Sequence, residues 1–185
     1  QSVGLPHDFS VTGTPEQDNP SGARGGFFPG GVGWYRTVVH ADDLSGDGPL
    51  WISFDGAYWC SDVYFNGAHL GFRPNGYTPF AYRINRDLIV EGENVVAVRV
   101  DNSRQPNCRW YSGSGLYRPV TLEMRPRLRI EREGVVLTSS ALLDENDAYA
   151  PQLHARITVA NDEDRDREGT CRLRLTSPDG AVRAE

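Results

Sequence analysis

The 185-residue sequence contains no lysine, so all 19 of its basic residues are arginine, and these are outnumbered by 25 acidic residues. The formal net charge is −6, and no two arginines are adjacent. A chain without a basic run is poorly suited to following a phosphate backbone, because nucleic-acid affinity depends on clustered positive charge. We therefore expect no nucleic-acid partner.

Long apolar runs and metal-ligand clusters are also lacking. No apolar stretch approaches the roughly 20 residues that a membrane-spanning helix needs, so no membrane span is expected. The three cysteines, Cys60, Cys108 and Cys171, are too few and too scattered to predict a disulfide framework or a zinc site. A Cys60–Cys108 pair and the cellular compartment both stay open. The acidic turn at 42–48 does not have the alternating ligands of a calcium loop, so we expect no metal and no cofactor.

Aromatic residues are nearly absent from the last third of the chain. Of the 19 Trp, Phe and Tyr residues, 18 lie before residue 126, and only Tyr149 follows. Seventeen of the 20 glycines lie in the same first part. So abrupt a shift in composition predicts a domain boundary near Arg125, with one domain at 1–125 and a second at 126–185.

No segment of the first domain shows an apolar stripe of helical period and length. Short β-branched and aromatic segments recur instead, separated by Gly- and Pro-rich turns, which indicates an all-β sandwich or barrel. The predicted strands cover residues 34–40, 50–54, 63–65, 68–70, 78–84, 95–100 and 120–124. Asn66-Gly67 predicts a two-residue hairpin, because both residues tolerate the positive φ angles of a type I′ turn.

The second domain is predicted to contain four strands, at 128–133, 134–138, 153–160 and 170–176. Residues 153–160 alternate between apolar and polar, as in a sheet with one face in water. The pattern resembles the start of an immunoglobulin-type sandwich, which needs about seven strands and about 100 residues. We therefore expect an incomplete immunoglobulin-like sandwich, in a natural chain that continues beyond Glu185.

Residues 101–118 form the densest polar and aromatic segment of the sequence. Amides and guanidinium groups can bind sugar hydroxyls, and the Trp110-Tyr111 pair offers aromatic faces for the C–H side of a sugar ring. The segment can equally be a long loop that its aromatic side chains and arginines anchor internally. From the chemistry alone, both interpretations stay open.

Seven ordered blocks in the first 118 residues resemble glycoside hydrolase family 2. The blocks are residues 5–8, 29–36, 54–58, 63–71, 74–80, 93–102 and 109–118, the last reading RWYSGSGLYR. The resemblance is to the N-terminal sugar-binding domain of the family and to the opening of its second domain. It implies a galactose-binding-like jelly-roll β-sandwich followed by a partial immunoglobulin-like β-sandwich.

The same resemblance implies that catalysis takes place elsewhere. In the family, two glutamates on a barrel that follows the second domain act as nucleophile and acid/base, and retaining hydrolysis needs carboxyl groups about 5–5.5 Å apart. No pair of acidic residues here is identified by its spacing, so we expect no catalytic residue and no activity from this chain alone. The expected partners are the catalytic barrel of the same full-length chain and a β-galactoside or related carbohydrate. A stand-alone carbohydrate-binding module or lectin is the alternative, and a purely structural domain is a third possibility.

The resemblance also suggests roles for individual residues of the segment 101–118. Asn107 and Arg109 are expected to contact substrate hydroxyls in the terminal-sugar subsite and to orient the substrate. The residues expected to brace the loop are Asp101, Asn102, Trp110, Tyr111 and Arg118.

Overall fold

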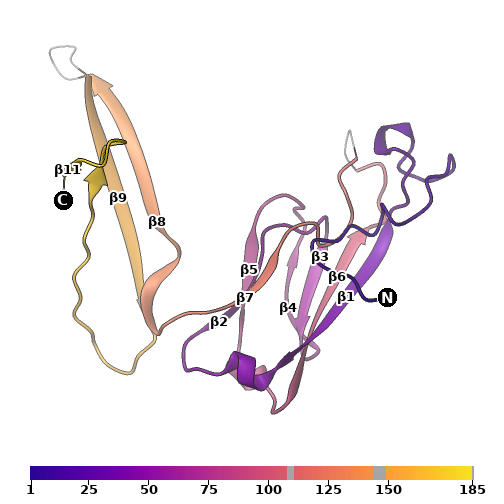
Figure 1. The fold of residues 1–185 in the computed structure, drawn as a ribbon, viewed down its shortest axis with the longest axis horizontal. Helices are drawn as coiled ribbons and strands as arrows, with labels where there is room; N and C mark the ends of the chain where they lie inside the picture. Colours follow the sequence, from indigo (N-terminus) through magenta and orange to yellow (C-terminus); the bar gives the residue numbers. More distant parts are fainter. Residues whose placement is uncertain (108–110, 144–148, 185) are drawn as a thin grey trace. The chain divides into compact units, whose positions relative to one another are not determined.

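The computed structural model describes residues 1–107, 111–143 and 149–184. The chain divides into two compact units, Gln1–Pro126 and Arg127–Glu185 (Figure 1). Among the described residues the only helical pieces are three short 3-10 turns, η1 (Ala23–Gly25), η2 (Ala41–Leu44) and η3 (Arg86–Leu88). The predicted all-β class is therefore confirmed.

The first unit is built from two antiparallel sheets. The four-stranded sheet has the order β1-β6-β3-β4 and consists of β1 (Gly31–His40), β6 (Glu93–Asn102), β3 (Ser61–Phe65) and β4 (Ala68–Arg73). The three-stranded sheet has the order β5-β2-β7 and consists of β5 (Phe80–Ile84), β2 (Leu50–Phe54) and β7 (Val120–Met124). This is the predicted jelly-roll sandwich.

The core of the first unit lies between the two sheets, because the strands alternate between inward apolar and outward residues. Along β6, Val96, Val98 and Val100 are buried, whereas the residues between them are half-buried. The facing sheet contributes Phe54, whose ring stacks on that of Phe80 at 4.7 Å between centroids. Each such side chain contributes roughly 1.5–3 kcal/mol on burial, and together they fix the strand register.

The predicted hairpin at Asn66-Gly67 is confirmed between β3 and β4. Asn66 has φ 47° and Gly67 has φ 80°, as a type I′ turn requires. The Asn66 amide also donates to the carbonyl of Leu88 at 2.8 Å and accepts from the Val95 backbone N–H at 2.7 Å. The turn thereby ties β3 to the beginning of β6.

The second unit contains two antiparallel pairs, β8 (Leu128–Leu143) with β9 (Tyr149–Asn161) and β10 (Leu175–Thr176) with β11 (Val182–Ala184). The prediction of separate strands at 128–133 and 134–138 is wrong, because both segments belong to β8. A register shift between Ile130 and Val135 accommodates Glu133, whose φ is 55°. The predicted strand at 170–176 is also too long. Only residues 175–176 pair, because β11 is just three residues long.

The connection between β6 and β7, residues 103–119, leads from the four-stranded sheet to the three-stranded one. We call it the site loop, because the residues predicted to bind sugar lie in it. Its second half is held by backbone hydrogen bonds from two sides. The N–H groups of His7 and Phe9 donate to Leu116 and Ser114 at 2.8 Å each, and Tyr58 exchanges two backbone bonds with Gly115.

Candidate functional site

A buried amide holds the two ends of the site loop together. Asn102, the last residue of β6, is only 2% exposed. Its Nδ2 donates to the carbonyl of Gly113 at 3.0 Å and to Ser114 Oγ at 2.6 Å. Its Oδ1 accepts from Gln105 Nε2 at 2.9 Å and from Asn107 Nδ2. One side chain thus joins the first part of the loop, at Gln105 and Asn107, to its second half, at Gly113 and Ser114.

Asn107 is half-buried within this network. Its Nδ2 donates to Asn102 Oδ1, and its Oδ1 accepts from the Tyr58 hydroxyl at 3.1 Å. A carboxamide has two N–H donors and two acceptor lone pairs. These two bonds orient the amide, and among the described residues they use one of its donors and one of its acceptor lone pairs.

Asp8, which sequence reasoning did not connect with the site loop, anchors the second half of the loop. Its Oδ1 accepts from the backbone N–H groups of Ser10 and Ser114 at 2.9 and 3.0 Å, and its Oδ2 accepts from the Tyr111 hydroxyl at 2.5 Å. Burial of the ring and the hydrogen bond to Asp8 raise the pKa of Tyr111. Tyr111 is therefore a neutral donor at physiological pH, and its polar end is used internally, as expected for a bracing residue.

Two buried hydroxyls extend this frame. Ser10 Oγ lies 2.5 Å from both Ser114 Oγ and the carbonyl oxygen of Pro29. Ser10 and Ser114 are almost completely buried. Buried hydroxyls are stable only when paired, and here the pairing joins the N-terminal segment and the approach to β1 to the site loop.

Asp101 fixes the first turn of the site loop. Its Oδ1 accepts from the Ser103 backbone N–H at 3.0 Å and from Ser103 Oγ at 2.6 Å, and its Oδ2 accepts from Arg99 Nη2 at 2.6 Å. These bonds, those from Ser103 first, lower the pKa of Asp101 from 3.8 to about 2. A carboxylate that hydrogen-bonds to the backbone two residues ahead favours a turn, so Asp101 sets the direction in which the chain leaves β6.

Arg118 and its neighbour Tyr117 hold a second loop, residues 74–79, beside the site loop. Arg118 Nη1 donates to the carbonyls of Asp55 and Tyr77 at 3.3 and 3.2 Å. The Tyr117 hydroxyl donates to the carbonyl of Gly76 at 2.7 Å. Arg118 thus has the contacts of a backbone anchor. The remaining predicted residues, Arg109 and Trp110, lie outside the described residues, as does Cys108.

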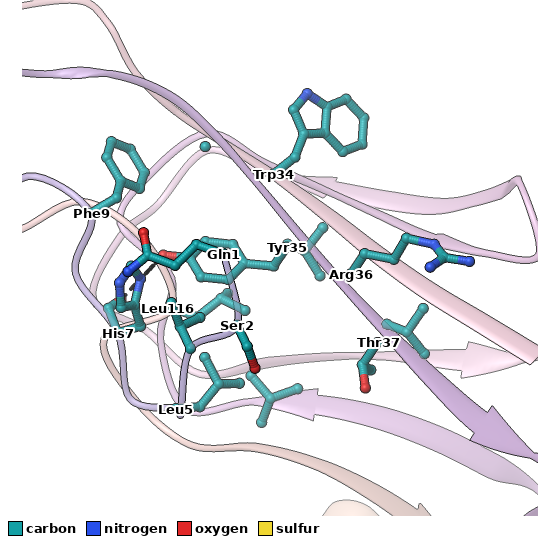
Figure 2. Close-up of a pocket in the computed structure, with 15 residues that line it drawn as sticks. Gln1, Ser2, Leu5, His7, Phe9, Trp34, Tyr35, Arg36, Thr37 and Leu116 are labelled. Carbon is teal, nitrogen blue, oxygen red and sulfur yellow. Dashed lines mark hydrogen bonds between the residues drawn. The ribbon is translucent and has the colours of Figure 1, made fainter.

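A separate recess of about 530 Å³ lies between the N-terminal segment and β1 (Figure 2). Figure 2 shows the rings of His7 and Tyr35 directed toward each other and Trp34 on the opposite face of the strand. His7 Nδ1 lies 2.9 Å from the Tyr35 hydroxyl, and burial raises the pKa of that hydroxyl. The polar groups of His7 and Tyr35 therefore bind each other at the recess.

Within residues 1–107, 111–143 and 149–184, no group of three or more His, Cys, Asp or Glu side chains is arranged to hold a metal ion. Over the same residues, no helix has the length and apolar character to span a membrane. Cys60 and Cys171 are free thiols.

Comparison with known proteins gives relatives along almost the whole chain, although no protein-family model matches. A β-galactosidase of Bacteroides ovatus is 41% identical over 98% of this chain and 21% of its own length. A putative β-glucuronidase of Formosa agariphila is 42% identical over 67% of this chain and 12% of its own length. The chain thus spans about a fifth or less of these relatives.

Solved structures show the same fold. A β-glycosidase from Bacteroides vulgatus matches with a TM-score of 0.78 and 32% identity, covering 97% of this chain and 23% of the other. A glycosyl hydrolase family 2 member from Bacteroides cellulosilyticus matches with a TM-score of 0.68 and 29% identity, covering 86% and 26%. Sheets like those described above therefore recur within much longer chains, of which the matched part is about a quarter.

Proposed function

Because this chain is an N-terminal region of glycoside hydrolase family 2 in sequence and in fold, we propose that it is the non-catalytic, substrate-positioning part of a retaining exo-glycoside hydrolase. Its site loop helps to shape the terminal-sugar subsite, and the catalytic carboxylates come from a barrel in the same full-length protein. Asn107 and Arg109 contact the substrate hydroxyls. Asp101, Asn102, Trp110, Tyr111 and Arg118 hold the loop in place.

The observation that carries this proposal is the orientation of the Asn107 amide. Asn102 and Tyr58 fix the amide from two sides, so binding a sugar hydroxyl costs little additional side-chain entropy. Rigid placement of polar groups is what substrate orientation requires, because displacements of about 1 Å lower rates strongly.

We propose a β-galactoside as the substrate. The relative that matches 98% of this chain is named a β-galactosidase, although another at similar identity is named a putative β-glucuronidase. The guanidinium of Arg109 can donate to the neutral hydroxyls of a galactoside and could also bind a uronate carboxylate, so the two substrates have to be separated by assay.

Assays with aryl β-galactoside and aryl β-glucuronide test the proposal. The purified 185-residue chain should hydrolyse neither, and the protein from the complete reading frame should hydrolyse the galactoside faster. Hydrolysis by the chain alone would overturn the non-catalytic role. Failure of the complete protein to hydrolyse either glycoside would overturn the glycosidase function, and sugar binding without hydrolysis would favour the lectin alternative.

The role of the site loop is tested in the same complete protein. Asn107→Ala should lower kcat/KM for the galactoside about fivefold or more, because each lost neutral hydrogen bond is worth ~1 kcal/mol. Arg109→Ala should lower it further. Arg156→Ala, which removes an exposed arginine of β9 in the second unit, is the matched control. Equal kcat/KM for all three variants and the wild type would show that the loop serves only as scaffold.

A further inference from the structure

The outer face of the four-stranded sheet carries exposed aromatic side chains. Trp34 on β1 is 61% exposed, and Phe72 on β4 is 51% exposed. Figure 2 shows the Trp34 ring on the other side of β1 from Tyr35, which packs against the core. Aromatic residues are enriched where one protein surface contacts another, so this face has the composition of a contact surface.

A single row of side chains crosses this face from one edge of the sheet to the other. The row consists of directly opposed residues on β1, β6, β3 and β4, namely Trp34, Arg99, Asp62 and Phe72. Directly opposed residues of an antiparallel pair lie on the same face. Beside the row, the Tyr64 ring lies 5.8 Å from that of Trp34 between centroids, at an interplanar angle of 31°. These five residues form one surface, which we call the outer platform.

The charged groups of the outer platform are paired with neighbouring side chains. The Arg99 guanidinium donates to Asp101 at 2.6 Å and to Asp62 at 3.5 Å. The Asp62 carboxylate also lies 3.0 Å from His69 Nε2. Charges can be covered by protein only when they are paired. A protein surface can therefore cover the platform without leaving these charges unpaired, whereas a sugar needs polar groups that are not already engaged.

The size of the face distinguishes a domain of the same chain from a second protein. Four strands about 4.8 Å apart, with a rise of about 3.4 Å per residue over the five-residue β3, give a face of about 19 Å by 17 Å, or roughly 320 Å². Interfaces between domains of one chain bury about 300–750 Å² on each side. A stable complex of two proteins buries about 800 Å² on each side. The face therefore fits a neighbouring domain.

The outer platform also adjoins the site loop, because Arg99 binds Asp101, which fixes the first turn of that loop. Most of the Bacteroides ovatus relative lies outside the matched part, which is 21% of its length. We propose that the outer platform is the surface on which the catalytic barrel of the same full-length protein docks, with Trp34 and Phe72 as its covered anchors. This inference rests on the proposed function, which supplies the barrel, and adds the surface that aligns the barrel with the site loop.

Hydroxyl-radical footprinting of the complete protein tests whether the outer platform is covered. The modification rate of each residue is compared with its rate in the urea-unfolded protein. A docked barrel that leaves about a tenth of Trp34 exposed, as in the core of an interface, should lower its relative rate about sixfold below that expected at 61% exposure. Val90, which is 52% exposed and lies outside the platform, is the control and should stay reactive. Relative rates of Trp34 and Phe72 that match their exposures given above would overturn the inference.

Photo-cross-linking of the complete protein identifies what covers the outer platform. The cross-linker p-benzoylphenylalanine in place of Phe72 should cross-link to the barrel of the same chain, and in place of Val90 it should not. Cross-links between two copies, or only to residues 127–185, would overturn the barrel as the partner. The footprint uses the wild-type protein, so it remains decisive if a cross-linker variant misfolds.

The outcomes separate this inference from the proposed function. A complete protein that hydrolyses the aryl β-galactoside but leaves Trp34 and Phe72 fully reactive, with no cross-link to the barrel, would overturn this inference alone. A complete protein that hydrolyses neither aryl glycoside, yet shows the protection and the cross-link, would overturn the proposed function alone.

Discussion

The carboxylate of Asp8 and the hydroxyl of Tyr111 lie 2.5 Å apart, although 103 residues separate them in the chain. Because Asp8 also accepts a hydrogen bond from the Ser114 backbone N–H, one side chain near the N-terminus fixes two points of the site loop. Hydrogen bonds to an ionised carboxylate are roughly twice as strong as neutral ones. The N-terminal segment is thus part of the frame that carries the candidate sugar contacts.

Asp8→Asn should lower the pKa of Tyr111, because the charge and the hydrogen bond of Asp8 both raise it. It should also destabilise the chain by about 1–2 kcal/mol, since hydrogen bonds to charged groups contribute ~1.5–3 kcal/mol and the amide keeps part of this. NMR titration of ring-labelled tyrosine measures the pKa, and urea unfolding of the 185-residue chain measures the stability. Asp43→Asn, an exposed carboxylate in η2, is the control. An unchanged Tyr111 pKa would contradict the coupling.

Asn102→Ala should have a larger effect on stability. It removes both donors from Gly113 and Ser114 and the acceptor for Gln105 and Asn107. Buried polar partners left unsatisfied cost about 1–3 kcal/mol each, so a total loss of roughly 3 kcal/mol is expected in thermal or urea unfolding.

Hydrogen exchange adds a local measurement for Asn102→Ala. The Ser114 amide should exchange faster than in the wild type, while the Val98 amide, in the middle of β6, should change only with global stability. Asn85→Ala, at an exposed N-cap outside the site loop, is the control. A stability equal to the wild type would show that the amide is not the brace of the loop.

The sequence predicted two strands of the three-stranded sheet with their exact bounds. β2 and β7 coincide with the predicted segments 50–54 and 120–124, because each is a short apolar segment bounded by turn residues. The strand predicted at 170–176 has a similar pattern, but pairing also needs a partner strand of matching length. The sequence pattern of one strand contains no information about its partner.

The distant hydrogen-bond partners that hold the site loop could not be predicted from the sequence. Asn107 and Asn102 stood out because they lie in a dense polar segment. Asp8 lies 103 residues from its partner Tyr111, and Tyr58 lies 49 residues from its partner Asn107. Hydrogen bonds over such separations depend on the tertiary arrangement, and a single sequence has no periodicity that reports them.

Stability between pH 4 and pH 2 should depend on Asp101. Its pKa in the folded chain, about 2, lies below its ordinary value of 3.8, so the fold favours the carboxylate. This contribution is fully present above pH 4 and is lost as the pH falls towards 2. Because the side chain is partly exposed and solvent screens it, we expect only about 1 kcal/mol. Urea unfolding should show a higher free energy of unfolding for the wild type than for Asp101→Asn at pH 6. The difference should be smaller at pH 2, where about half of the folded-state carboxylate is protonated. A difference independent of pH would contradict the assignment.

Gly115→Ala should disrupt the packing where the site loop meets the N-terminal segment and β1. Gly115 has φ +129°, and a Cβ there would lie 2.2 Å from the Tyr35 hydroxyl and 2.8 Å from the His7 carbonyl oxygen. Overpacking and an unfavourable φ together should cost about 3 kcal/mol in urea unfolding. Adding Tyr35→Phe removes the nearest clashing atom and should recover about 1 kcal/mol, so the two changes should not be additive. Gly169→Ala, with no neighbour within 4 Å, should leave stability unchanged. Additive losses in the double variant would mean that the Tyr35 hydroxyl does not limit the space at this junction.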